Sequence, residues 1–375
     1  MEELLIIIVV LALFFDFTNG FHDTANAIAT SVSTKALPPK VAVIWAAILN
    51  FLGAFVSLKV AATVAKGVVA TQFVTLEVVL AGIVGAIIWN LFTWRIGMPT
   101  SSSHALIGGV AGAAIAGFGM EAIKWQGLQQ KVIIPSLVAP FLGLLIALLI
   151  MLFISRLTRG KNEEKTESIF RRLQVASASF VAFTHGTNDA QKTMGIIALA
   201  LIAANPGREF DVPIWVIFSS ALFMALGTYV GGWRIIKTLG ERIVDLKPKQ
   251  GFAAETATAS ILWTTAHFGF PVSTTHTISS SIVGSGIARK PSKINWKIVR
   301  SILIAWLFTL PCAALVGASM KYITDLPAGD FVVFALAVAL SASIIFTRHW
   351  KRESFVQVLA RLLPIDRSSR RSLKV

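Results

Sequence analysis

Apolar segments long enough to cross a membrane recur along the whole of this 375-residue sequence. A helix needs about 20 mostly apolar residues to traverse the hydrocarbon core of a bilayer. Runs near that length lie at 41–58, 73–94, 132–155, 213–232, 300–320 and 330–347. Because 55% of the residues are hydrophobic and only 14% are charged, a soluble domain is excluded. We therefore expect an all-α polytopic membrane protein with about 10–12 transmembrane segments.

The formal net charge of +15 does not indicate a nucleic-acid partner. The basic residues gather in connectors at 156–172, 234–249 and 289–300, where they serve membrane topology and indicate the cytoplasmic side. The first apolar run begins at residue 4 without a basic leader or a small-residue cleavage site, so we expect a retained helix. The predicted location is the cell (plasma) membrane, multi-pass, and the compact chain favours a prokaryote.

Two polar motifs interrupt the apolar runs in nearly the same way. Aligning TNGFHDTANA with THGTNDAQKT pairs Asp23 with Asp189 and Asn26 with Lys192. An ionisable group inside a membrane is costly and by default marks a functional site. The ionisable residues in or beside apolar runs are Asp16, Asp23, Asp189, Lys192, Glu255, His22, His104, His185, His267 and His276.

A second pair of motifs, GMPTSSSHALIGG and GFPVSTTHTISSS, follows the first pair in the same order. Gly20 and Gly97 are 77 residues apart, and Gly186 and Gly269 are 83 residues apart. Two motifs at nearly equal spacing indicate a duplication. Keeping every basic connector on one side of the membrane requires the two halves to have opposite orientations, as in many secondary transporters.

The predicted organisation has four parts. The first inverted repeat covers 1–155, a basic cytoplasmic linker covers 156–174, the second inverted repeat covers 175–347, and a basic C-terminal tail covers 348–375. In both repeats Gly-x-Pro precedes a Ser/Thr run, and proline prevents a helix from continuing. Inside a membrane such a break survives only where protein or a water-filled cavity covers it. We therefore expect broken helices and helical hairpins facing the protein interior near the midplane.

The first motif pair offers oxygen ligands for a cation. Asp23 and Asn26 share a helix face at i and i+3, whereas the adjacent Asn188 and Asp189 need an unwound backbone to converge. Carboxylate, amide and hydroxyl oxygens suit a hard cation, and soft metals prefer thiolate or imidazole. The coupling ion is therefore expected to be Na⁺ or H⁺.

The second motif pair offers donors for an anion. Hydroxyl side chains fill 101–103 and 273–275, directly after the expected helix breaks, where backbone N–H groups of a new helix would point the same way. A seam of small residues that lets helices pack closely is the alternative interpretation. Cations beside the aspartates would neutralise them and attract a tetrahedral oxyanion, so the combination predicts symport.

These motifs resemble those of the inorganic phosphate transporter (PiT) family of sodium- or proton-coupled phosphate symporters. The similarity includes GFHDTANA, GTNDAQKT and the paired P-x-S-x-[ST]-H segments, and it extends from about residue 10 to 347. The resemblance implies inverted repeats and cation-coupled uptake of inorganic phosphate. His22, Gln191 and Lys192 depart from the family pattern. The Gln-Lys ending is similar to bacterial members, some of which use protons or carry metal-phosphate.

The family pattern and the chemistry of the residues together assign the site. No catalytic residue is expected, and the two repeats would rock around the centre in alternating access. Phosphate is assigned to Ser102, Ser103, Thr274, Thr275 and Gln191, and Na⁺ to Asp23, Asn26, Asn188, Asp189, Ser101 and Ser273.

A symporter of inorganic phosphate with Na⁺ is the favoured interpretation, and three alternatives stay open at this point. One is H⁺-coupled uptake of phosphate or metal-phosphate with histidines as proton carriers. The others are an intramembrane metal hydrolase using His185 and Asp189 at i and i+4, which lacks HExxH-like spacing, and a channel. The expected partners are inorganic phosphate, Na⁺ or H⁺ and the lipid bilayer; whether the chain forms a homodimer is open.

Overall fold

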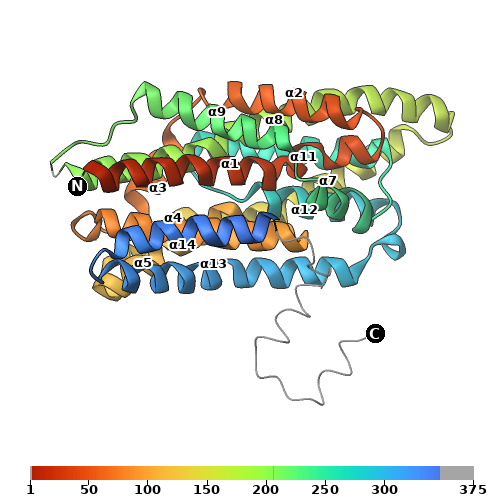
Figure 1. Ribbon diagram of the computed structural model, residues 1–375. Helices are drawn as coiled ribbons and strands as arrows, with labels where there is room; N and C mark the ends of the chain where they lie inside the picture. Colours follow the sequence, from red (N-terminus) through yellow and green to blue (C-terminus); the bar gives the residue numbers. More distant parts are fainter. Residues whose placement is uncertain (1, 206, 347–375) are drawn as a thin grey trace, which may run out of the picture.

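The computed structural model describes residues 2–205 and 207–346, and these residues form a bundle of helices (Figure 1). The helices are α1 (Glu2–Ser33), α2 (Pro39–Gly53), α3 (Lys59–Gly67), α4 (Leu76–Ile96), α5 (Ser102–Phe118), α6 (Trp125–Leu128), α7 (Ile134–Leu157), α8 (Glu163–Ala204), α9 (Ile214–Val230), α10 (Trp233–Lys237), α11 (Pro248–Phe268), α12 (Thr274–Arg289), α13 (Trp296–Thr324) and α14 (Gly329–Phe346). Within these ranges the only extended pairing is an isolated antiparallel bridge between Val69 and Ile123. The all-α prediction is confirmed.

Five helical segments among the described residues are long and apolar enough to cross a bilayer. They are α1, α4, the continuous run Trp125–Leu157, α13 and α14. A sixth candidate joins α9 to the segment Trp233–Arg242 across a 58° bend. Multi-pass membrane insertion is thereby supported, whereas the total of 10–12 segments, the inverted relation of the halves and the repeat boundaries stay predictions.

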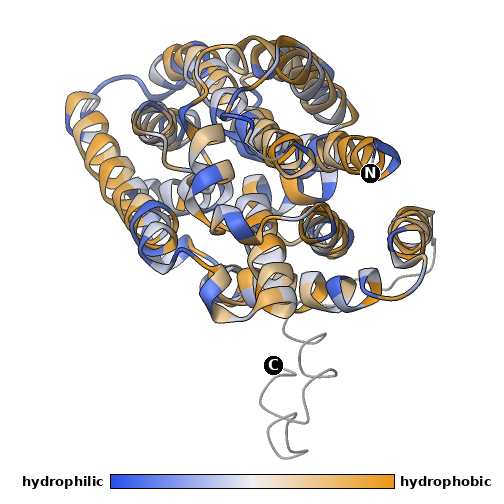
Figure 2. Cartoon of the chain, turned by 90° about the vertical axis from the view of Figure 1, so that its left-hand side faces the viewer, coloured by the Kyte–Doolittle hydropathy of each residue, from blue (hydrophilic) through white to orange (hydrophobic). Residues whose placement is uncertain are grey.

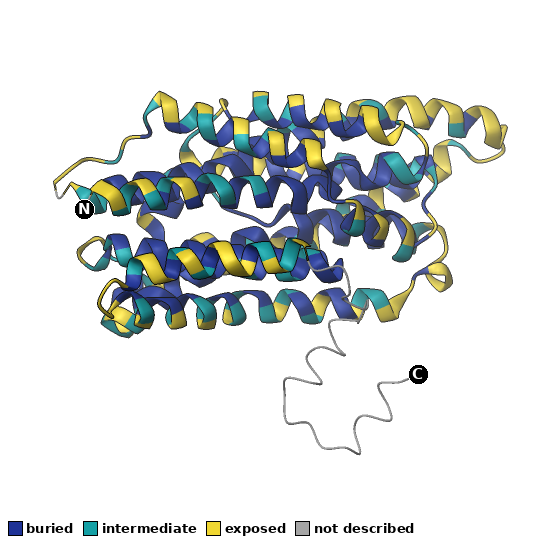
Figure 3. Cartoon of the chain, in the orientation of Figure 1, coloured by how far each residue is buried: buried dark blue, intermediate teal, exposed yellow. Residues whose placement is uncertain are grey.

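Hydrophobic residues are frequent on the outer helices (Figure 2), and the helices in the middle of the bundle are buried (Figure 3). Leu137 on α7 and Leu307 on α13 are 70% and 73% exposed, while the second half of α1 is buried on all sides. Lipid can cover exposed leucines but cannot hydrogen-bond to a backbone. The outer surface therefore suits a bilayer, and the polar motifs face protein.

The two helices that carry the first motif pair lie against each other in the middle of the bundle. α1 packs on α8, α9 and α4, and α8 packs in addition on α2, α3 and α11. α12 also contacts α1, and α5 packs between α4 and α13. This packing brings residues from both halves of the sequence to one centre.

The first Gly-x-Pro break separates α4 from α5. Gly97 ends α4 in a left-handed conformation, φ +71°, which glycine adopts without a Cβ clash. Pro99 follows and has no N–H to continue the helix. Ser101 then caps α5, because its hydroxyl accepts a hydrogen bond of 3.1 Å from the backbone N–H of His104.

The second break separates α11 from α12 with the same local chemistry. Gly269 ends α11 at φ +76°, and Pro271 follows. Ser273 caps α12, its hydroxyl accepting from the backbone N–H of His276 at 3.2 Å. The expected helix breaks are therefore present in both motifs.

The region predicted as the linker 156–174 is mostly helical. α7 ends at Leu157 and α8 begins at Glu163, where Asn162 caps it by accepting from the backbone N–H of Lys165 at 2.9 Å. α8 then runs unbroken to Ala204, so the expected unwinding at residues 188–189 is wrong. The predicted tail 348–375 lies outside the described residues.

Candidate functional site: a buried carboxylate and hydroxyl centre

Three ionisable side chains meet where α1 crosses α8. One ligand atom each from Asp23, His185 and Asp189 lies within 4.8 Å of the other two, and all three residues are buried. The pairing of Asp23 with Asp189 in the sequence alignment therefore corresponds to proximity in space. Two carboxylates this close in a low-dielectric interior repel each other unless cationic groups accompany them.

Asp23 is held by three different helices. Nδ1 of its neighbour His22 lies 2.7 Å from Oδ1, and this contact is a hydrogen bond when that nitrogen carries the proton. Ser102, the first residue of α5, donates to Oδ2 at 2.8 Å. Thr275 on α12 donates to Oδ1 at 3.2 Å. The carboxylate therefore connects α1 to the starts of both short helices.

Asp189 has a different set of partners. The ammonium of Lys192, one turn later on α8, lies 2.6 Å from Oδ1, and Thr274 donates to the same oxygen at 3.1 Å. The second oxygen, Oδ2, lies 3.6 Å from Nε2 of His185 and accepts no hydrogen bond within the described chain. Lys192 therefore supplies the positive charge nearest to this carboxylate.

The hydroxyls predicted to bind phosphate lie at the same place. Ser102, Thr274 and Thr275 reach the two carboxylates, and Asn26 donates to Thr275 at 2.9 Å. Ser103 makes only a long contact of 3.5 Å to a backbone carbonyl, that of Val272. The N-termini of α5 and α12 therefore meet the aspartates through hydroxyl groups.

Other predicted site residues lie apart from these contacts. Gln191 caps α3, because its Oε1 accepts from the backbone N–H groups of Val60 and Ala61 at 2.9 and 3.3 Å. The side-chain oxygen of Gln191 is therefore already engaged, and its assignment to phosphate stays a prediction. Ser101 and Ser273 use their hydroxyls as helix caps.

Asn188 does not converge with its neighbour Asp189, because consecutive residues of a helix point about 100° apart. Its side-chain nitrogen and oxygen are buried, and neither forms a hydrogen bond in the part of the chain that the structure describes. Asn188 therefore lies next to the centre without contributing to its hydrogen bonds.

Asn50 and Thr228 orient the central histidine, and sequence reasoning missed both. Oδ1 of Asn50 lies 3.0 Å from Nδ1 of His185, and Nδ2 of Asn50 donates to Thr228 at 2.9 Å. The contact with Asn50 places the ring proton on Nδ1, so Nε2 presents a lone pair toward Asp189. The only signal available was an isolated asparagine in the apolar run 41–58.

Trp306 on α13 contacts both Gly-x-Pro segments. Its indole ring stacks on His276 with centroids 4.0 Å apart, and its N–H donates to the carbonyl of Pro99 at 3.0 Å. His276 also meets His104 edge to face at 4.9 Å, and Nε2 of His104 lies 2.7 Å from the Ser136 hydroxyl on α7. One tryptophan therefore joins the two short helices that bring hydroxyls to the centre.

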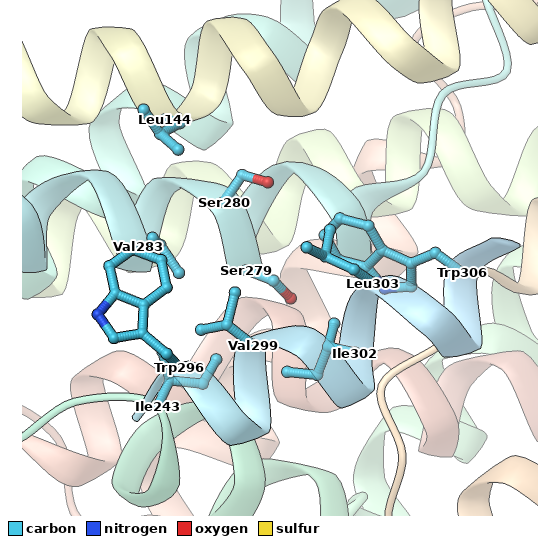
Figure 4. Close-up of a pocket in the computed structure, with 10 residues that line it drawn as sticks. All are labelled: Leu144, Ile243, Ser279, Ser280, Val283, Trp296, Val299, Ile302, Leu303 and Trp306. Atoms are coloured by element: carbon cyan, nitrogen blue, oxygen red, sulfur yellow. The ribbon is translucent and has the colours of Figure 1, made fainter. Parts of the chain in front are cut away.

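A separate pocket lies between α12 and α13 (Figure 4). It has a volume of about 170 Å³, and its walls are apolar apart from Ser279 and Ser280. The Ser279 hydroxyl is already used, donating to the carbonyl of Thr275 at 2.6 Å. No charged residue of the described chain lines the pocket, so it does not offer the charges that an ion needs.

Known proteins with similar sequences are phosphate transporters. Residues 19–317 match the phosphate transporter family. A protein of Mycobacterium tuberculosis strain H37Rv named "Probable low-affinity inorganic phosphate transporter" is 50% identical over 351 residues, covering 92% of this chain and 84% of the relative. A Bacillus subtilis strain 168 protein with the same name is 46% identical over 328 residues, covering 86% and 98%.

A solved structure described as "The sodium-dependent phosphate transporter" has a similar fold. Its TM-score is 0.78 at 24% sequence identity, and the alignment covers 86% of this chain and 99% of that one. At this identity the likeness supports the arrangement of helices and leaves the ion chemistry to the residues themselves.

Proposed function

The chain belongs to the phosphate transporter family, and from this premise we propose that it symports inorganic phosphate with a cation across the plasma membrane by alternating access. The resemblance drawn from the motifs is confirmed, and the chain is a transporter and not an enzyme, so the hydrolase alternative is wrong. Its apolar helices and bacterial relatives make it a multi-pass protein of the plasma membrane. A homodimer stays a prediction.

One observation carries the symport proposal. Asp23 and Asp189 converge at the centre, and hydroxyls at the N-termini of α5 and α12 reach the same carboxylates. A helix N-terminus and hydroxyl donors favour an anion, whereas carboxylates repel one. Phosphate therefore enters at low cost only together with positive charge, which makes its binding and cation binding mutually dependent.

Na⁺ is the first candidate for the coupling cation. The centre offers carboxylate, amide and hydroxyl oxygens, which are ligands for a hard cation, and the only thiol, Cys312, lies on α13. A structure of the same fold is described as sodium-dependent. In this case Asp23 and Asp189 bind Na⁺, and Ser102, Ser103, Thr274 and Thr275 turn their hydroxyls toward phosphate.

A proton is the second candidate, and a specific observation favours it. Each central carboxylate already has a nitrogen partner, His22 for Asp23 and Lys192 for Asp189. His185 presents Nε2 toward Asp189, 3.6 Å from its free oxygen. Histidines placed in this way can take up a proton and neutralise a carboxylate without a metal ion.

The test is uptake of labelled phosphate into proteoliposomes that contain the purified chain. An inward Na⁺ gradient is compared with equimolar choline at fixed pH, and separately with an inward proton gradient. Coupling through the centre predicts accumulation under one gradient and its loss in Asp189→Asn. The exposed Asp211 provides a control, since Asp211→Asn removes one carboxylate that does not belong to the buried centre. Unaffected accumulation in Asp189→Asn would contradict the proposal, and so would an absence of uptake under both gradients.

A further inference from the structure

Asp16 is a buried carboxylate that receives no hydrogen bond from the residues of the centre. It lies on α1 with no exposed surface, and neither oxygen accepts a hydrogen bond from any residue that the structure describes. An isolated ionised carboxylate costs far more free energy in a protein interior than in water. A group of this kind in a membrane helix needs either a proton or a bound cation.

The surroundings of Asp16 offer further oxygen atoms without partners. The Thr193 hydroxyl on α8 approaches the Asp16 carboxylate without the geometry of a hydrogen bond, and it is fully buried. Asn19 follows three residues after Asp16, so it lies on the same face of α1. Both polar atoms of its buried amide are unbonded within the described residues. Three neutral or anionic oxygen ligands therefore lie along one side of α1.

The charges nearby do not compensate Asp16. Asp189 repels it and Lys192 attracts it, but the ammonium of Lys192 lies 2.6 Å from Asp189 and is already paired there. Asp23 likewise has His22 as a close partner. Of these three carboxylates, Asp16 alone has no nitrogen base in contact, as judged from the ion pairs of the described chain.

We propose that Asp16, Asn19 and Thr193 bind a Na⁺ ion at a site separate from the central carboxylate pair. The site lies about 10 Å along α1 from Asp23, at a rise of 1.5 Å per residue. Carboxylate, amide and hydroxyl oxygens form the hard ligand set that suits an alkali cation. The inference rests on the proposed function, since it identifies where a symported metal cation binds when nitrogen groups occupy the two central aspartates.

The test measures equilibrium binding of radioactive Na⁺ to the purified full-length chain at fixed pH without phosphate. Asp16→Asn is expected to lose one saturable Na⁺ site, and the exposed control Asp211→Asn is expected to keep it. Thr193→Val keeps the charge and the shape but removes one ligand, and it is expected to weaken binding about tenfold. Thermal unfolding of each variant shows whether it is folded, and Thr193→Val and Asn19→Ala provide the test if Asp16→Asn does not fold.

Three results would overturn the proposal. The first is that the unmodified chain shows no saturable Na⁺ binding. The second is that the folded variants bind Na⁺ as the unmodified chain does. The third is that Asp16→Asn changes proton uptake and leaves Na⁺ binding unchanged. Because the binding assay needs no transport, its outcome is separable from that of the uptake assay. Intact Na⁺ binding without phosphate uptake would refute the proposed function and leave the Asp16 site standing.

Discussion

The ammonium of Lys192 lies 2.6 Å from Oδ1 of Asp189, and each side chain is only 1% exposed. Removing two charges from water costs several kcal/mol per ion, which their mutual attraction repays only with close geometry. The pair therefore depends on both members. It also gives the centre a cation that is covalently attached to α8 and cannot leave with the transported ions.

Lys192→Met should destabilise the protein by about 3–5 kcal/mol, because it leaves the Asp189 carboxylate buried and unpaired. The double variant Lys192→Met/Asp189→Asn should recover most of that loss. The free energy of unfolding of the single and the double variant is measured in detergent. The matched control is Lys247→Met, which removes a partially exposed partner of Glu167 at 3.7 Å and should cost at most about 1 kcal/mol. Equal losses in the single and double variants would contradict the ion-pair account.

Ser103→Ala should raise the KM for phosphate about tenfold while the half-saturating cation concentration stays unchanged. The reason is that the Ser103 hydroxyl contacts no carboxylate in the described structure and is available to phosphate. Ser102→Ala should alter both quantities, because this hydroxyl donates to Asp23 at 2.8 Å. Initial uptake rates measured over a range of phosphate concentrations and a range of cation concentrations distinguish the two variants. Identical effects of the two substitutions would refute the different roles given to Ser102 and Ser103.

Gly186→Ala should prevent the close approach of α8 to α2. A Cβ at this position would lie 2.1 Å from the carbonyl oxygen of Asn50, and backbone cannot yield as a flexible side chain can. We expect a large loss of folded protein in a fluorescence-detected size-exclusion profile. Gly67→Ala is the control, since its nearest neighbour is the Thr63 side chain at 3.4 Å. Normal folding of Gly186→Ala would show that α2 and α8 can separate.

Glu255→Ala should destabilise the contact between α1, α8 and α11 by about 3 kcal/mol. The buried Glu255 carboxylate accepts hydrogen bonds from Thr30 at 2.5 Å, Gln174 at 3.0 Å and Ser177 at 2.5 Å, and alanine removes the acceptor that these three donors share. Glu255→Gln retains the size of the side chain and should lose less stability. Comparison of their apparent unfolding temperatures tests the account, which an equally large loss in both variants would contradict.

Those parts of the centre that depend on local chemistry are predictable from the sequence. A charged group in an apolar run must face protein, and this requirement alone assigns Asp23 and Asp189 to the interior. Gly-x-Pro followed by serine specifies the helix breaks, because glycine, proline and a capping hydroxyl each have a local conformational reason to be there. These inferences need no knowledge of which helices touch.

Contacts between distant segments could not be predicted in this way. Asn50 meets His185 and Gln191 caps α3 only because α2 and α3 pack on α8. The unwound backbone expected at Asn188 was wrong for the same reason. The hydroxyl of Thr274 reaches Asp189 from α12, so α8 satisfies its own backbone hydrogen bonds and still takes part in the centre.

The contacts of Trp306 limit how the centre can move. Its indole holds the carbonyl of Pro99 on one side and the ring of His276 on the other, so segments more than a hundred residues apart share one anchor on α13. A tilt of α13 is therefore transmitted to the starts of α5 and α12 together. The two helix breaks are thus connected mechanically through a single side chain on α13.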